Sequence, residues 1–76
     1  MHTAEWIHRQ PVVSSCLSSV GYEAGTRTLE VEFRSGGVYC YLEVPACVHE
    51  SLMKAPSTGR FFATNIRDRF RHVRVA

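Results

Sequence analysis

The sequence lacks a long hydrophobic run of the kind that crosses a membrane. No stretch approaches the roughly 18 consecutive apolar residues that a membrane-spanning helix needs. The first ten residues contain Glu5 and His8 where a secretory signal requires an apolar segment. We therefore expect a soluble, cytoplasmic protein with no membrane partner.

The sequence contains few cysteines, and no two of them are closely spaced. They are Cys16, Cys40 and Cys47, an odd number with no Cys-x-x-Cys pair. Small disulfide-bonded proteins carry an even number, and a structural zinc site needs closely spaced ligands. The histidines, His2, His8, His49 and His72, are too scattered to form a metal site. We expect free thiols, no metal and no cofactor, with Cys40 buried in a hairpin and Cys47 on or near the inner face of a helix.

Motifs for catalysis are missing as well. Neither serine nor cysteine lies in a recognisable nucleophile motif. His49 and Glu50 are neighbours on an expected helix and therefore point apart, while Asp68 is the only acid of its region. We predict that the protein is not an enzyme.

What the chain does contain is typical of one small folded domain. Its 76 residues include 45% hydrophobic side chains, and five glycines and three prolines are not an excess. A chain this short buries only about 60% of its unfolded surface, so we expect marginal stability. Because Gln10-Pro11 prevents a helix near the start, residues 1–12 are predicted to form a loosely held arm and residues 13–76 a single domain.

Alternating apolar and polar residues predict an antiparallel hairpin. In residues 28–33 three apolar side chains alternate with two glutamates, the period of a half-buried strand. Residues 35–37, Ser-Gly-Gly, are expected to close the hairpin, and residues 38–44 to return as the second strand. A weaker strand signal covers residues 16–22.

Two short helices are predicted after the hairpin. Pro45 fits the first position of a helix, where its missing N–H would have no partner in any case. Val48 and Leu52 give this helix an apolar side, and Pro56 ends it.

The second predicted helix begins directly after the first. Ser57 can cap it, and Phe62, Ile66 and Phe70 recur at intervals of four residues to dock it on the sheet. Residues 72–75 alternate again and provide the option of a short edge strand. The predicted class is α+β: an antiparallel meander of about three strands with two short helices packed on one face.

The order and spacing of several markers resemble a known family. These markers are Ser14-Ser15, Val20-Gly21-Tyr22, Leu29-x-Val31-x-Phe33, Gly37-x-Tyr39-x-Tyr41, Val44-Pro45, Leu52, Ala55-x-Ser57-x-Gly59, Phe62 and Ile66-Arg67. Over residues 13–71 the chain is similar to the KTSC domain, a bacterial and phage family that occurs at the C-terminus of some lysyl-tRNA synthetases and also as short stand-alone proteins. The resemblance implies no established activity, and a role in RNA binding follows from it only by association. The pair Phe61-Phe62 is more aromatic than the family pattern, which leaves open whether Phe61 is buried or exposed.

Tyr39 and Tyr41 lie two residues apart on one strand and must share a face of the sheet, which the hairpin register decides. A loop of two or four residues pairs Phe33 with Val38 and places both tyrosines on the polar side. A three-residue loop over 35–37 pairs Phe33 with Tyr39 and places both in the core. Exposed tyrosines form a platform for stacking bases, at about 1–3 kcal/mol each, whereas buried ones simply pack against a helix. We prefer the second role for at least one of them.

Positive charge is concentrated at the end of the chain. Residues 60–76 carry five arginines against one acid, whereas residues 1–59 carry four basic side chains against six acids. On a continuous helix, Arg60, Arg67 and Arg71 would lie within about 40° of one another, a stripe suited to a phosphate backbone. The same composition is typical of a solvated helix face.

We predict a small non-enzymatic module that binds RNA, either tRNA or a single strand. The predicted site comprises Tyr39, Tyr41, Ser57, Gly59, Arg60, Arg67, Arg71 and Arg74. Ser57 and Gly59 open a helix whose free N–H groups form a small anion site, or else serve only as a cap and as a point of close helix packing. The alternative is a protein–protein interaction module that uses the same face or an exposed strand edge. We expect a monomer, with self-association through the final strand as a third option.

Overall fold

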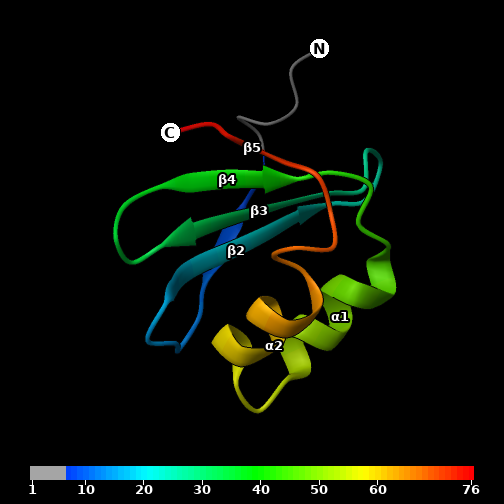
Figure 1. Cartoon of the computed structure of the whole chain (residues 1–76). Helices are drawn as coiled ribbons and strands as arrows, with labels where there is room; N and C mark the ends of the chain where they lie inside the picture. Colours follow the sequence, from blue (N-terminus) through cyan, green and yellow to red (C-terminus); the bar gives the residue numbers. More distant parts are fainter. Residues whose placement is uncertain (1–6) are drawn as a thin grey trace.

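The computed structural model describes residues 7–76 as a five-stranded antiparallel sheet with two helices on one face (Figure 1). The strands are β1 (Arg9–Pro11), β2 (Leu17–Glu23), β3 (Thr28–Phe33), β4 (Val38–Tyr41) and β5 (His72–Arg74), and they neighbour one another in this order. Helices α1 (Ala46–Lys54) and α2 (Thr58–Asn65) connect β4 to β5. The α+β class and the C-terminal edge strand are confirmed, with five strands where about three were predicted. No helix within residues 7–76 combines the length and the apolar character needed to cross a membrane.

The predicted N-terminal arm, residues 1–12, contains a strand that sequence reasoning missed. Arg9–Pro11 pairs antiparallel with Ser19–Gly21 of β2 and forms one edge of the sheet. Three residues are too few to show a period, and proline is tolerated on an edge strand because one side of that strand needs no ladder hydrogen bonds. Residues 1–6 of the arm lie outside the described part of the chain.

The β3–β4 hairpin settles which face the two tyrosines occupy. Tyr39 pairs with Val31 and Tyr41 with Leu29, so both tyrosines lie on the helix-covered face. The loop has three residues and ends at Gly36, whose φ of 111° is a conformation that glycine adopts without strain. The three-residue alternative is therefore correct in loop length and in the face of the tyrosines. The loop lies one residue earlier than expected, so the predicted pairing of Phe33 with Tyr39 is wrong.

The core lies between the sheet and the two helices. Its fully buried side chains come from β2, β3, the segment between β4 and α1, helix α1 and the turn after α2: Leu17, Val20, Leu29, Val31, Val44, Leu52 and Ile66. Phe62 of α2 contacts Phe33 and Tyr41 edge-on, with ring centroids 5.5 Å and 5.3 Å apart. Phe61 is half-buried at the margin of this core. The docking of α2 on the sheet thus depends mainly on one aromatic side chain.

The side of helix α1 that faces the sheet does not include Cys47, contrary to the prediction. Leu52 is fully buried and Val48 is half-buried, as expected. Cys47 is exposed, so its predicted inner position is wrong. Pro45 caps the helix and is not its first residue.

An aromatic stack attaches α1 to the sheet. The rings of Tyr22 and His49 are 4.7 Å apart and nearly parallel, and the Tyr22 hydroxyl donates a hydrogen bond to the Val44 carbonyl at 2.5 Å. Burial lowers the pKa of His49, with Glu50 acting in the opposite direction, which favours the neutral ring that a stack needs.

Candidate nucleic-acid interface

A groove opens between β4, β5 and the turn that follows α2. It is lined by Phe33, Ser35, Tyr39, Tyr41, Arg67, Asp68 and His72, and we call it the tyrosine groove. Because β5 pairs antiparallel with β4, His72 stands beside Tyr41 and Arg74 beside Tyr39. Residues that are distant in the sequence are thereby placed on one side of the sheet.

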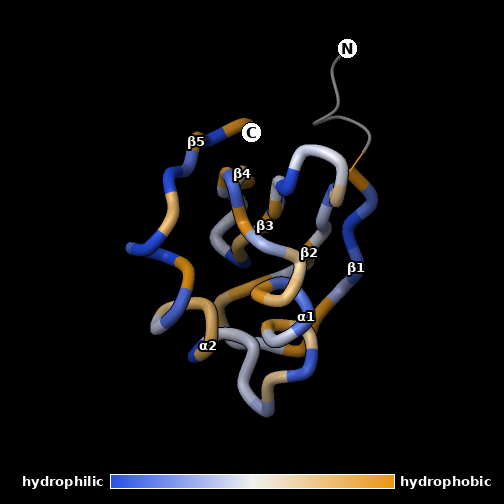
Figure 2. Tube along the Cα trace, turned by 90° about the vertical axis from the view of Figure 1, so that its right-hand side faces the viewer, coloured by the Kyte–Doolittle hydropathy of each residue, from blue (hydrophilic) through white to orange (hydrophobic). Residues whose placement is uncertain are grey.

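The turn after α2 carries Arg67 into the tyrosine groove. Ile66, directly before it, is fully buried and anchors the start of the turn. At the far end, the amide of Leu42 donates to the carbonyl of Arg71 at 2.8 Å. Figure 2 shows hydrophilic stretches between α2 and β5 along this path. Since both ends of the turn are held, its charged side chains are presented from a defined backbone.

Aromatic rings form the floor of the groove. The exposed His72 ring lies 5.1 Å from the Tyr41 ring and 5.7 Å from the Tyr39 ring. The Arg74 guanidinium carbon lies 5.9 Å from the centre of the Tyr39 ring, within the range of a cation–π contact. Tyr41 is buried apart from 3% of its surface, and burial is the main cause of its raised pKa, so its hydroxyl stays protonated at neutral pH.

The surface around the groove carries an excess of positive charge, with Asp68 as the acid that lines the groove. Its arginines, Arg67, Arg69, Arg71 and Arg74, are all exposed. None of them forms an ion pair with an acid among residues 7–76. Such a surface attracts polyanions, because solvated guanidinium groups remain free to bind phosphate.

The predicted helical stripe of arginines is wrong. Helix α2 ends at Asn65, so Arg67 and Arg71 lie in the following turn and not on the same helix as Arg60. Arg60 borders a separate, mostly apolar groove together with Phe61. The prediction assumed a helical rotation per residue that does not apply to Arg67 and Arg71, because both lie beyond the end of the helix.

The other two predicted residues at the start of α2 have structural contacts. Ser57 caps the helix as expected, accepting a hydrogen bond from the Arg60 amide at 3.2 Å. Gly59 allows close approach to Ser14, since a Cβ at this position would lie 2.9 Å from the serine hydroxyl. Close packing at Gly59 therefore involves the loop before β2, whereas the sequence favoured the other helix.

The structure thus divides the predicted site. Four of its residues come together at the tyrosine groove: Tyr39, Tyr41, Arg67 and Arg74. Three others lie at the opposite end of α2: Ser57, Gly59 and Arg60. Arg71 lies where the turn meets the end of β4. Sequence reasoning missed His72 and Asp68 as groove residues. The alternation of residues 72–75 did indicate a strand there, but only the pairing of β5 with β4 shows what His72 contacts.

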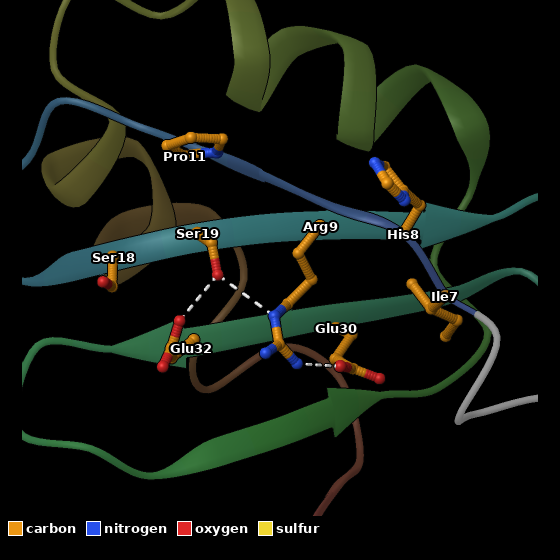
Figure 3. Close-up of a pocket in the computed structure, with 8 residues that line it drawn as sticks. All are labelled: Ile7, His8, Arg9, Pro11, Ser18, Ser19, Glu30 and Glu32. Carbon is orange, nitrogen blue, oxygen red and sulfur yellow. Dashed lines mark hydrogen bonds and ion pairs between the residues drawn. The ribbon is translucent and has the colours of Figure 1, made fainter.

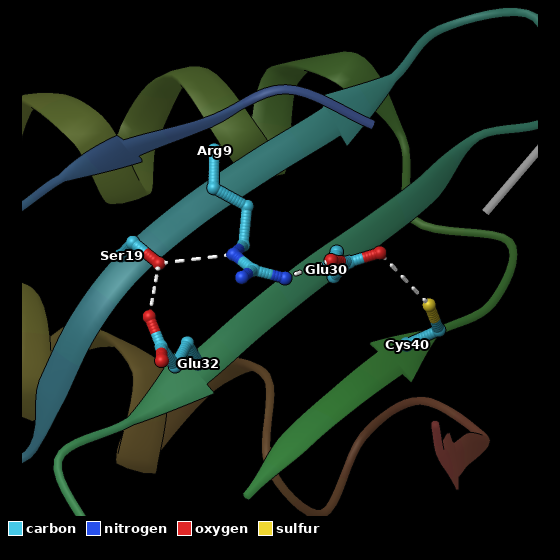
Figure 4. Close-up of polar contacts among 5 residues, drawn as sticks. All are labelled: Arg9, Ser19, Glu30, Glu32 and Cys40. Carbon is cyan, nitrogen blue, oxygen red and sulfur yellow. Dashed lines mark hydrogen bonds and ion pairs between the residues drawn. The ribbon is translucent and has the colours of Figure 1, made fainter. Parts of the chain in front are cut away.

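The sheet face opposite the helices carries a polar network (Figure 4). One row of paired positions crosses all five strands: Arg9, Gly21, Glu30, Cys40 and Val73. Arg9 reaches across β2 and forms an ion pair with Glu30 of β3. Gly21 permits this crossing, because a Cβ there would lie 3.1 Å from Cγ of Arg9 and 2.7 Å from the carbonyl oxygen of His8.

Further hydrogen bonds complete the network. Nε of Arg9 donates to the Ser19 hydroxyl at 3.1 Å, and that hydroxyl donates to Glu32 at 2.9 Å. The Cys40 thiol donates to Glu30 at 3.7 Å, a contact typical of a weak S–H donor. Glu30 is only 5% exposed, although sequence alternation placed it on the polar side of its strand.

A hollow beside this network is shown in Figure 3. It is lined by Ile7, His8, Arg9, Pro11, Ser18, Ser19, Glu30 and Glu32. Within residues 7–76 no three His, Cys, Asp or Glu side chains are placed to bind one metal ion. The contacts of the network join β1, β2, β3 and β4, which is a structural role.

The three thiols should differ sharply in reactivity. Cys16 and Cys47 are exposed, whereas burial, followed by the charge of Glu30, raises the pKa of the buried Cys40 to about 11. Because the thiolate is the nucleophile, we expect iodoacetamide at pH 8 to label Cys16 and Cys47 in the native protein and Cys40 only after denaturation. Peptide mass spectrometry measures this, and equal labelling of all three in the native state would contradict the expectation.

Comparison with known proteins agrees with the fold. Residues 13–70 match the family model of the KTSC domain. A crystal structure of a KTSC domain protein from Yersinia pestis superimposes with a TM-score of 0.90 at 43% identity, covering 92% of this chain and 99% of that one. A protein from Tsukamurella paurometabola is 42% identical over 64 residues, covering 84% of this chain and 96% of the relative. A lysine–tRNA ligase from Trichormus variabilis is 40% identical over 62 residues, and the match spans only 11% of that enzyme.

Proposed function

Because the chain belongs to the KTSC domain family, we propose that it is a non-enzymatic RNA-binding module. RNA binds at the tyrosine groove and at the arginines around it, with the protein acting as a monomer in the cytoplasm. The observation that carries this proposal is the set of four exposed arginines, without acidic partners among residues 7–76, around a groove floored by aromatic rings. The similarity of the chain to a segment of a lysine–tRNA ligase supports the same substrate class.

Each part of the site has a separate role in this proposal. Arg67 and Arg71 neutralise phosphates of the backbone, and each phosphate contact releases counterions. Arg74 is positioned over the Tyr39 ring, so that its guanidinium presents a flat surface beside the groove. The phosphate contacts provide affinity and the aromatic rings favour an unpaired strand.

Removing two of the four exposed arginines together, Arg67 in the groove and Arg71 in the same turn, should weaken RNA binding. For Arg67→Ala/Arg71→Ala we expect the Kd for a single-stranded RNA or for tRNA to rise about tenfold, since two phosphate contacts are lost. The slope of log Kd against log salt should fall by about 1.4 for the single strand. Fluorescence anisotropy between low and moderate salt measures both quantities.

The matched control removes the same charge elsewhere. Arg27→Gly/Lys54→Ala deletes two exposed cations outside the 60–74 segment, and glycine suits position 27, where φ is 56°. This variant should bind RNA nearly as the unmodified chain does. If both double variants bind RNA equally weakly, the rise in Kd depends only on net charge. If Arg67→Ala/Arg71→Ala binds as tightly as the unmodified chain, the proposed role of these two arginines is refuted.

A protein partner is the second candidate function, and one observation favours it. Strand β5 is an edge strand. Val73 within it is 49% exposed, and Val75, directly after its end, is 46% exposed. An extended segment of another protein can add to such an edge. Nuclease treatment of a pull-down distinguishes the two functions, because a protein partner remains bound and an RNA-mediated one is lost.

A further inference from the structure

Asp68 is an unexpected residue on a surface built to attract phosphate. It is the only acid in residues 60–76, and it lines the tyrosine groove next to Arg67. It is exposed and forms no ion pair with a basic side chain among residues 7–76. A carboxylate repels phosphates, so its presence within the groove points to a contact with a part of the ligand that donates hydrogen bonds.

The bases of RNA differ in what they offer to a carboxylate. Guanine presents two adjacent donors, N1–H and the N2 amino group, which match the two oxygens of Asp68. Each of the other bases offers a single donor group with at least one acceptor beside it, and that acceptor repels the second carboxylate oxygen. Guanine also presents the acceptors O6 and N7, which are the usual partners of arginine. The neighbouring acid and base of the groove, Asp68 and Arg67, therefore complement guanine better than any other base.

The groove also provides a surface for the ring of a base. His72 is exposed, and its ring makes tilted contacts with the rings of Tyr41 at 5.1 Å and Tyr39 at 5.7 Å. The Arg74 guanidinium already lies over Tyr39, so His72 is the ring left open for stacking. Splayed bases of single strands stack on aromatic side chains of this kind.

We propose that the tyrosine groove binds one guanine of a single-stranded RNA, with Asp68 accepting from its Watson–Crick edge and His72 stacking on its ring. The proposal rests on the RNA-binding function above and adds base selectivity to it. Asp68 is the residue that determines specificity, Arg67 contributes to both phosphate and base contacts, and the remaining arginines bind the backbone regardless of sequence.

Four five-nucleotide RNAs that differ only in the central base test the proposal: UUGUU, UUAUU, UUCUU and UUUUU. With the full chain we expect UUGUU to bind about tenfold more tightly than the other three. Inosine at the centre lacks the N2 amino group and should lose part of that preference. Isothermal titration at low salt measures the four affinities.

Two substitutions separate specificity from general affinity. Asp68→Asn keeps the shape of an exposed side chain but replaces one acceptor by a donor, so the preference for UUGUU should vanish while the other three RNAs bind as well as before or better. His72→Ala should weaken all four about equally, since stacking does not depend on the base. Circular dichroism tests whether both variants remain folded.

The outcomes also distinguish this proposal from the proposed function. Equal affinity for all four RNAs, or a guanine preference that survives Asp68→Asn, overturns the base pocket. If the Arg67→Ala/Arg71→Ala variant still weakens binding in that case, RNA binding stands without selectivity. If none of the four RNAs nor tRNA binds at low salt, both proposals fail.

Discussion

Replacing Phe62 with alanine should lower the free energy of unfolding by about 3–5 kcal/mol. The side chain is 3% exposed and its ring meets Phe33 and Tyr41 edge-on, so truncation removes both contacts and leaves a cavity between α2 and the sheet. A domain of this size has a total stability of only roughly 5 kcal/mol. The variant should therefore be largely unfolded at 37 °C, as measured by urea titration with circular dichroism.

The neighbouring phenylalanine provides the control. Phe61 is half-buried at the margin of the core, so Phe61→Ala should cost about 1 kcal/mol. Phe62→Leu, which retains a smaller apolar side chain, should fall between the two alanine variants. If Phe61→Ala were as destabilising as Phe62→Ala, the assignment of Phe62 as the main contact between helix and sheet would be wrong.

Replacing Arg9 with alanine should destabilise the protein by about 3 kcal/mol. The substitution leaves the Glu30 carboxylate, 5% exposed, without its guanidinium partner, and an uncompensated buried charge typically costs about 3–5 kcal/mol. The expected value lies at the lower end because 31% of the Arg9 side chain is exposed to solvent. Strand β1 should also detach, since Arg9 is its main link to β3. Amide hydrogen exchange of Arg9, Gln10 and residues 19–21 measures this detachment.

A double substitution tests whether the loss of stability in Arg9→Ala comes from the missing ion pair or from the buried charge that remains on Glu30. Arg9→Met/Glu30→Leu replaces both members by apolar side chains and should recover most of the lost stability, because no charge remains buried. Arg69→Ala, at an exposed position, should change stability by less than about 0.5 kcal/mol. The interpretation would be refuted if the double variant were less stable than Arg9→Ala, or if Arg9→Ala behaved like Arg69→Ala.

Features that depend on near neighbours in the chain were predictable. The period of β3 follows from alternation over six residues, and Pro56 ends α1 because it restricts the residue before it. Ser57 caps α2 through a hydrogen bond to an amide three residues away. These are local steric and hydrogen-bonding preferences, and the α+β class follows from their order along the chain.

Features that depend on register were only partly predictable. The two tyrosines had to share a face, but which face depended on whether the loop contained an even or an odd number of residues, and two glycines suited both lengths. The predicted helical stripe through Arg60 and Arg67 was wrong because the end of α2 also depends on tertiary packing. The fully buried Ile66 belongs to the turn, so the chain leaves the helix where tertiary packing requires it.

By itself, the sequence determined the α+β class, the order of the elements from β2 to α2, the family and the excess of arginine near the end, because each of these is a property of composition or of short-range pattern. The tertiary structure alone decided that Arg9 crosses Gly21 to reach Glu30, and that His72 and Asp68 share a groove with Tyr39 and Tyr41. Those contacts join residues that are far apart in the sequence. They arise from strand pairing and packing, whose free energies are summed over the whole domain and leave no local trace in the sequence.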